Sequence, residues 1–129
     1  MNTNKTIIQP DVYVICDPNR IQGRDVLGGP DLAVEILSVS TMLKDSVIKL
    51  EKYKNAGVKF YWLVDPFFKL VLVYDLERLR AGDTGNCVKK HTFHDKIPVG
   101  IWPEGAVVDF EKIMKFAQPL YDAQKPDAK

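Results

Sequence analysis

Short apolar runs separated by turn-forming residues predict strands along most of the chain. Residues 12–16 and 31–38 are rich in β-branched and other apolar side chains. The second run is apolar almost throughout, which is typical of a strand buried on both faces. Two further apolar runs, 58–64 and 69–74, are separated by a short turn and therefore predict a hairpin.

Residues 41–55 repeat their apolar positions with a helical period instead. At about 100° per residue, an arc of roughly 140° holds most of the apolar side chains of this segment: Met42, Leu43, Val47, Leu50 and Tyr53. Gly57 suits the position just after a helix. Strand, helix and strand over residues 31–64 therefore predict a right-handed βαβ crossover.

The C-terminal third has a weaker pattern. Residues 88–93 and a short stretch around Ile97 predict edge strands, and residues 111–117 predict a short helix capped by Asp109. We expect the tail, residues 119–129, to fray. The pattern as a whole predicts an α/β fold for residues 1–129, as a single domain with a mixed sheet of about five strands and one central helix.

Composition narrows the class of protein. The chain has 129 residues, with 18 Lys and Arg against 17 Asp and Glu, for a net charge of +1. This balance excludes a strongly basic nucleic-acid arm and a polyacidic tail. The N-terminus lacks the apolar stretch of a signal peptide, no apolar run approaches the roughly 20 residues of a membrane span, and the two cysteines have no CxxC spacing. We expect a cytoplasmic protein with no membrane association.

Glu35 is the most informative single residue, because it interrupts the apolar run at 31–38. A carboxylate inside a sheet is costly to bury unless it is paired or bound to a metal. It has two interpretations: a metal ligand, or a structural partner for a lysine of the helix.

Asp11 opens the strand that precedes the Glu35 strand. If the two strands pair as a long hairpin, Asp11 lies opposite the middle or end of the Glu35 strand. Neighbouring carboxylates repel each other unless a cation lies between them, and such oxygen-rich sites suit magnesium. Alternatively, Pro10-Asp11 only marks the start of a strand and has no role in a site. Asp31 is either a third metal ligand or a loop cap.

Lys49 is the third candidate, since it lies about 20° beyond the apolar arc of the helix. An amine at that edge can lean over the sheet toward Glu35, where it could orient an attacking water or stabilise charge that develops on a phosphate. The alternative is an i,i+4 pair with Asp45 on a solvated face. Four aromatic residues are expected in the core, with base stacking as the alternative: Tyr61, Trp62, Phe67 and Phe68.

Several ordered blocks together resemble one family. The blocks are Gln9-Pro10-Asp11-Val12, Gly29-Pro30-Asp31-Leu32-Ala33-Val34-Glu35-Ile36-Leu37-Ser38, Asp45-x-x-x-Lys49 with Tyr53, and Gly57-Val58-x-x-Tyr61-Trp62-Leu63-Val64-Asp65-Pro66. They resemble the Uma-two family of restriction-endonuclease-like proteins, within the PD-(D/E)XK nuclease superfamily. The resemblance extends from residue 9 to residue 74.

The resemblance implies a restriction endonuclease-like mixed β-sheet with a central βαβ crossover helix, and magnesium-dependent hydrolysis of DNA. Asp11 would be the acid of the first strand, and Glu35 the acid of the (D/E)XK element. The lysine expected two residues after Glu35 is replaced by Leu37, and Lys49 would supply the amine. The cofactor would be Mg²⁺ or Mn²⁺, held by Asp11 and Glu35, with Asp31 as a possible third ligand.

The chain departs from the family pattern in ways that leave other functions open. Family members usually carry an N-terminal helix and strands before the first block, with an acidic residue in that helix, whereas this chain starts almost at the block. Phe60 replaces a glutamate, and Val39 replaces a proline. We expect a sheet left uncovered on one side, and hence burial of that side against another copy, as a homo-oligomer, or against a missing partner segment. The alternatives are a catalytically impaired remnant acting as an oligomerising or binding module, and a plain oligomerising domain with a structural Glu35–Lys49 pair.

Overall fold

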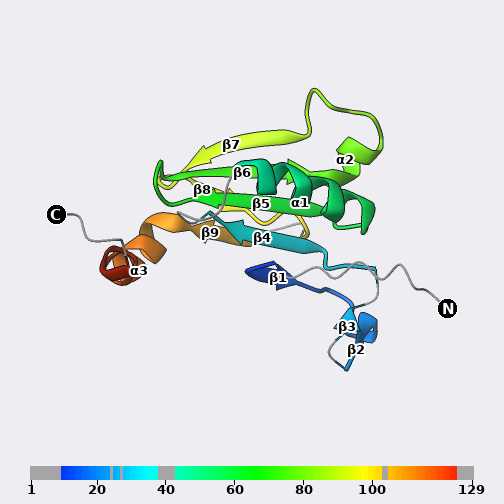
Figure 1. Ribbon diagram of the computed structural model, residues 1–129, viewed down its shortest axis with the longest axis horizontal. Helices are drawn as coiled ribbons and strands as arrows, with labels where there is room; N and C mark the ends of the chain where they lie inside the picture. Colours follow the sequence, from blue (N-terminus) through cyan, green and yellow to red (C-terminus); the bar gives the residue numbers. More distant parts are fainter. Residues whose placement is uncertain (1–9, 24, 27, 38–42, 103–104, 125–129) are drawn as a thin grey trace.

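A five-stranded mixed sheet forms the centre of the computed structural model, which describes residues 10–23, 25–26, 28–37, 43–102 and 105–124 (Figure 1). The strand order is β1-β4-β5-β6-β7. The strands are β1 (Val12–Val14), β4 (Leu32–Ile36), β5 (Phe60–Asp65), β6 (Leu70–Asp75) and β7 (Val88–Thr92). β4 and β5 are parallel, and the other neighbours are antiparallel. The predicted mixed sheet, crossover, hairpin and edge strand β7 are confirmed.

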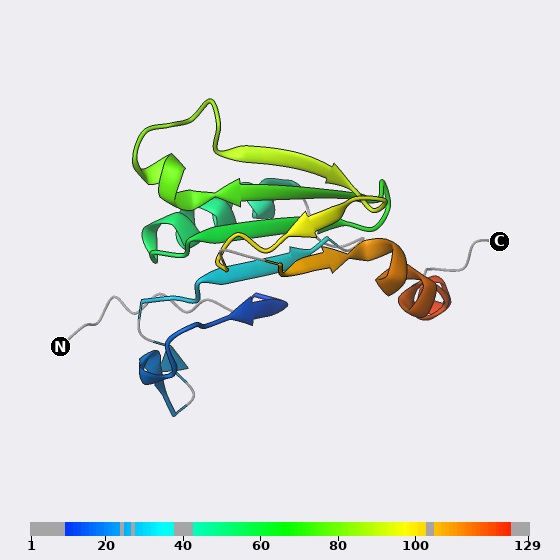
Figure 2. The same ribbon diagram turned by 180° about the vertical axis from the view of Figure 1, so that it is seen from behind.

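Smaller elements surround the sheet. The helices are α1 (Leu43–Asn55), α2 (Leu76–Arg80) and α3 (Phe110–Gln124), with a 3₁₀ turn η1 at Pro18–Arg20. Two short hairpins pair β2 (Ile21–Gln22) with β3 (Asp25–Val26), and β8 (Lys96–Pro98) with β9 (Val107–Asp109). Helix α1 lies against one face of the sheet, and β8 and β9 lie on the other (Figures 1 and 2).

The sheet buries a separate apolar cluster on each face. Because successive strand residues point to opposite faces, Leu32 and Ala33 of β4 enter different clusters. The cluster under α1 includes Ala33, Tyr53, Val58, Tyr61, Leu63 and Leu76. The cluster on the other face includes Leu32, Trp62, Val64, Val71, Phe93, Ile97, Val99 and Phe110. The long apolar run around residue 35 is therefore explained by burial on both faces.

Two glycines join the ends of the βαβ unit. Gly57 has φ +85° just after α1, and Gly29 has φ +80° before β4. A Cβ atom on Gly29 would lie 3.0 Å from the carbonyl oxygen of Ala56. Arg80 strengthens the same corner, since its Nη1 donates hydrogen bonds to the carbonyl oxygens of Lys54 (3.0 Å) and Val58 (2.9 Å). The corner therefore anchors the C-terminal end of α1 to the sheet.

Three details differ from the expectations. Helix α3 continues to Gln124, beyond the predicted end at residue 117. Phe67 and Phe68 are 46% and 77% exposed instead of lying in the core. They occupy the β5–β6 turn beyond the end of the sheet, where their N–H groups donate hydrogen bonds to Asp65 Oδ1. Val47 is 60% exposed despite its place on the apolar arc, because α1 packs through its C-terminal half.

Some expectations fall outside what the structure tests. The side chains of Met42, Leu43 and Asp45 lie outside the described residues, as does Val39. Among the described residues, no helix is long and apolar enough to cross a membrane. The cellular compartment, the single-domain organisation and the homo-oligomer remain predictions.

Candidate active site

Glu35 is a buried carboxylate with two partners from one helix. Glu35 is 5% exposed, and its side chain projects from β4 toward α1. Lys49 Nζ lies 3.1 Å from Glu35 Oε1. Tyr53, one helical turn after Lys49, donates a hydrogen bond from its hydroxyl to Glu35 Oε2. The proximity of Lys49 to Glu35, which its position on the helix predicts, is present in the structure.

Asp11 lies next to Glu35 across the β1–β4 pair. The register joins Val12 to Val34, so the next position outward sets Asp11 opposite Glu35. Asp11 Oδ2 accepts a hydrogen bond of 2.7 Å from the N–H of Ile36. Its other carboxylate oxygen has no hydrogen-bond partner among the described residues. Two carboxylates therefore meet at one end of this strand pair, as the hairpin argument predicts.

Three tyrosine rings pack in a row that begins at Tyr53, the residue that contacts Glu35. The rings of Tyr53 and Tyr61 meet edge to face at 5.1 Å between centroids, and Tyr61 stacks on Tyr74 at 5.6 Å. Burial raises the pKa of Tyr53, and the hydrogen bond to Glu35 and the charge of that carboxylate raise it further. The charge of Asp11 contributes in the same direction, which agrees with its place near this hydroxyl. Tyr53 therefore remains a proton donor.

The hydroxyl of Tyr53 is the feature of this site that the sequence reasoning missed. The helical period counts Tyr53 only as an apolar position, although its spacing of four after Lys49 sets both polar groups on one side of α1. Tyr61 adds a second buried hydroxyl, which has no hydrogen-bond partner among the described residues. Burial and the charge of Glu35 raise the pKa of Tyr61 as well.

Asp31 lies immediately before β4 and four residues before Glu35, about 13 Å away along the backbone. Its carboxylate is 3.2 Å from Arg20 Nη1 and 3.7 Å from Lys59 Nζ, and it accepts a 2.7 Å hydrogen bond from the N–H of Cys16. Burial alone would raise its pKa, but the Cys16 N–H and the two cations lower it overall. These contacts hold the start of β4 and favour the loop-cap interpretation.

A family model supports the resemblance. The model of the Uma2 family, described as "Putative restriction endonuclease", matches residues 2–92. The chain belongs to the Uma2 family. The match includes every residue of the Glu35 site, and it ends at the last residue of β7.

A solved structure shares the fold of this Uma2 protein. It is described as a putative nuclease belonging to DUF820 from Anabaena variabilis, and it superposes with a TM-score of 0.53 at 18% sequence identity. The alignment covers 67% of this chain and 45% of the nuclease, so the Uma2 chain spans less than half of that protein. The likeness shows a restriction endonuclease-like fold. No curated protein matches the chain.

The donor set at Glu35 suits a hard divalent cation. Magnesium is commonly bound through one or two carboxylates, with water and substrate phosphates completing its shell. Asp11 and Glu35 supply two carboxylates, one of which has an oxygen free of partners among the described residues. In the part of the chain that the structure describes, no group of three His, Cys, Asp or Glu residues could hold a metal ion. Among the described residues, a cation at Glu35 would therefore have only Asp11 and Glu35 as carboxylate ligands.

Proposed function

We propose that this Uma2 protein is a metal-dependent nuclease that hydrolyses DNA phosphodiester bonds. The observation that carries the proposal is the buried carboxylate of Glu35, with an acidic residue across the strand pair and a lysine leaning over it from α1. Charged groups that are buried beside other charged groups are common at catalytic sites. Family membership points in the same direction.

Each residue has a role in the proposal. Asp11 and Glu35 would hold Mg²⁺ or Mn²⁺, which when bound would lower the pKa of a coordinated water and neutralise phosphate charge. Lys49, whose side chain is 38% exposed, can reach a substrate phosphate and stabilise the negative charge that develops there. Tyr53 holds the carboxylate of Glu35 in place. Asp31 is the weaker candidate for a third ligand, because its charge is already compensated.

One observation favours a second candidate function, a plain oligomerising domain in which the Glu35–Lys49 pair is purely structural. Lys49 contacts Glu35 directly at 3.1 Å, as a purely structural ion pair would. A buried pair of this kind needs no ligand to compensate for its desolvation. The two functions differ in what the removal of the Glu35 charge should do.

The test is DNA cleavage by the wild type and by Glu35→Gln, which keeps the shape of the side chain and removes its charge. Supercoiled plasmid and single-stranded DNA are incubated with Mg²⁺, with Mn²⁺ or with EDTA. Glu51→Gln is the matched control, because Glu51 is an exposed glutamate of the same region that pairs with Lys54. We expect metal-dependent cleavage by the wild type and by Glu51→Gln, and a loss of about a hundredfold or more in Glu35→Gln.

Two results would overturn the nuclease proposal: no metal-dependent cleavage by the wild type, or equal cleavage by Glu35→Gln. Either would leave the oligomerising domain as the better function, and calorimetric titration with Mg²⁺ would then show no heat that depends on Glu35. Self-association is part of both functions as proposed here. Light scattering on the same preparations measures whether the wild type is larger than a monomer.

A further inference from the structure

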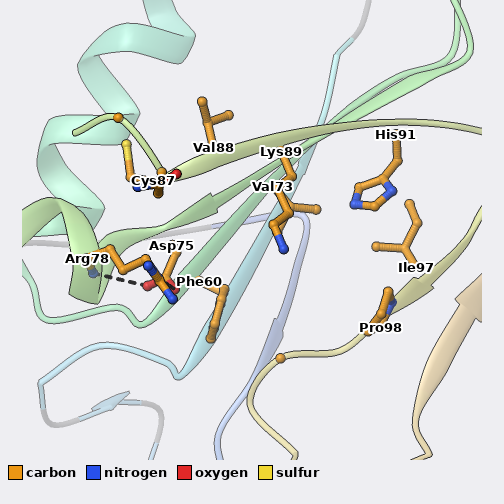
Figure 3. A pocket seen from close by; sticks show the side chains of 13 residues that line it. Phe60, Val73, Asp75, Arg78, Cys87, Val88, Lys89, His91, Ile97 and Pro98 are labelled. Atoms are coloured by element: carbon orange, nitrogen blue, oxygen red, sulfur yellow. Dashed lines mark hydrogen bonds and ion pairs between the residues drawn. The ribbon is translucent and has the colours of Figure 1, made fainter. Parts of the chain in front are cut away.

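A cavity of about 540 Å³ lies on the opposite face of the sheet from Glu35 (Figure 3). Val73 pairs with Trp62 on one side and with Lys89 on the other, so all three side chains point to the face covered by β8 and β9. Glu35 points to the other face, under α1. The cavity is therefore separate from the proposed nuclease site, although its volume is in the range of small-molecule sites.

One part of the cavity is apolar. Phe60 and Val73 pack against the cluster that contains Ile97, which is 1% exposed, and Pro98 lies beside them (Figure 3). Gly100 completes this part, since a Cβ atom there would lie 2.7 Å from Cζ of Phe60. A flat or aliphatic ligand body would bury its surface on these side chains.

β7 brings to the cavity an imidazole nitrogen and an amine that is unpaired among the described residues. Lys89 and His91 are two residues apart on this strand, so they share the face that lines the cavity. The Lys89 amine has no ion pair or hydrogen bond among the described residues, whereas His91 Nδ1 lies 3.5 Å from Asp95 Oδ2. The pairing at Nδ1 leaves Nε2 of His91 without a hydrogen-bond partner within the described part of the chain.

The other charged groups of the cavity compensate each other. Arg78 Nε lies 3.4 Å from Asp75 Oδ2, and Arg78 Nη1 lies 3.1 Å from Asp83 Oδ2. Asp75, the acidic residue that lines the cavity, is thus already paired with a cation. Among the residues that line the cavity, the charges of Asp75 and Arg78 cancel, and Lys89 leaves one positive charge that favours an anion beside it.

We infer that this cavity binds a small organic anion, with a flat apolar body against Phe60, Val73 and Ile97 and an anionic head group at Lys89 and His91. A carboxylate or a phosphate monoester supplies the required head, since both accept hydrogen bonds from an amine and an imidazole. The site is independent of metal binding at Glu35.

The experiment uses phenyl phosphate and benzoate as probes, titrated into the full chain and followed by amide chemical shifts and calorimetry. Inorganic phosphate tests the head group alone, and phenol tests the body alone. We expect one or both aromatic anions to shift the amides that line the cavity and to bind more tightly than either fragment. Comparing the two anions identifies the preferred head group.

Neighbouring lysines of β7 provide a matched pair of variants. Lys89→Met removes the charge at the cavity, whereas Lys90→Met removes the same charge from the opposite face, where Lys90 pairs with Leu72. Both residues are exposed, so neither change disturbs the core. We expect Lys89→Met to weaken binding about fivefold, as loss of an exposed charge contact does, with no change in Lys90→Met.

Three results would overturn the inference. They are the absence of cavity shifts at millimolar concentrations of both aromatic anions, equal losses in the two lysine variants, and binding of inorganic phosphate as tight as that of phenyl phosphate. Glu35→Gln should bind the probes as the wild type does, so this test stands apart from that of the nuclease proposal.

Discussion

At the scale of single residues, Glu35 must compensate for the water that it loses inside the sheet. Desolvation of a carboxylate costs several kcal/mol in a protein interior. Lys49 offsets part of this cost through charge, and Tyr53 offsets another part through its hydroxyl. The same carboxylate acts on the tyrosines, because its charge disfavours a second negative charge nearby.

This coupling predicts an effect of Glu35→Gln on tyrosine ionisation. Burial raises the pKa of Tyr53 and Tyr61 above the ordinary range, and the Glu35 carboxylate raises both further. Replacing the charge should bring both phenols closer to ordinary ionisation, so phenolate absorbance should appear at a lower pH in Glu35→Gln. The unfolded chain releases these protons first, so the free energy of unfolding of the wild type should fall as pH rises above the ordinary tyrosine range.

Alkaline titration of absorbance, with urea unfolding at each pH, measures both effects. Glu51→Gln is again the control, since its exposed carboxylate is not among the groups that shift either tyrosine. Identical titration curves for the wild type and Glu35→Gln would contradict the coupling.

Sequence reasoning identifies the acidic pair and the lysine of this site because each depends on a short-range rule. Glu35 is conspicuous as a charge in an apolar run, strand pairing sets Asp11 opposite it, and the helical period sets Lys49 beside it. The same reasoning misses the hydroxyl of Tyr53, since its direction depends on how α1 packs on the sheet. It leaves the role of Asp31 open for a related reason: its cationic partners come from two separate segments.

At the scale of elements, the corner between the Gly29 loop and the end of α1 sets the position of the helix that carries Lys49. Gly28 and Gly29 both have positive φ, at +77° and +80°. Only Gly29 is crowded, because a Cβ atom there would lie 3.0 Å from the Ala56 carbonyl oxygen. A Cβ atom on Gly28 would have no other atom within 4 Å. Both glycines therefore have a backbone conformation that strains other residues, but only Gly29 lies too close to its neighbours for a side chain.

Alanine substitution separates the two effects. Gly28→Ala should lower the free energy of unfolding by about 1 kcal/mol, the cost of a left-handed backbone. Gly29→Ala should cost more, about 2–3 kcal/mol, since the crowded corner must also move. Urea denaturation of both variants measures the difference, and equal losses would show that the close approach contributes nothing.

The long elements follow from the sequence more completely than the short ones. β4, β5, β6, β7 and α1 span enough residues for an apolar pattern to appear, and the pairing of these strands is confirmed. The three-residue strands β1 and β8 lie within the predicted runs at 12–16 and around Ile97. β2, β3 and β9 have only two or three residues each, and the sequence analysis does not predict them. α2 has five residues, and it begins where the Asp75 side chain accepts a hydrogen bond from the N–H of Arg78. Such caps are visible only once the neighbouring strand is placed.

At the scale of the whole molecule, the two faces of the sheet carry different chemistry. The α1 face has the carboxylates of Asp11 and Glu35, and the opposite face has a cavity beside the Lys89 amine of β7, which is unpaired among the described residues. The overall charge of +1 hides this division, because opposite charges cancel in the sum. A nearly neutral composition therefore excludes strong uniform charge but leaves local sites open.

Asp31 links the stability of the whole molecule to pH. Its carboxylate joins the loop after β1, the η1 turn and the start of β5 through the N–H of Cys16, Arg20 and Lys59. Because these groups hold its pKa below the ordinary value of 3.8, the stabilisation is present above that pH and is lost as the pH falls through the lower folded value.

Asp31→Asn should therefore lower the free energy of unfolding by about 1–3 kcal/mol at neutral pH, because two cations lose their buried partner. Below pH 3.8 the stability of the variant should also fall less than that of the wild type, since position 31 no longer carries a carboxylate that can be protonated. Urea denaturation between pH 3 and pH 7 measures both changes, with Asp83→Asn as the control because that carboxylate is exposed and pairs only on the surface. If Asp31→Asn and the wild type lost stability in parallel as the pH fell, the acid sensitivity of the fold would have to come from other carboxylates.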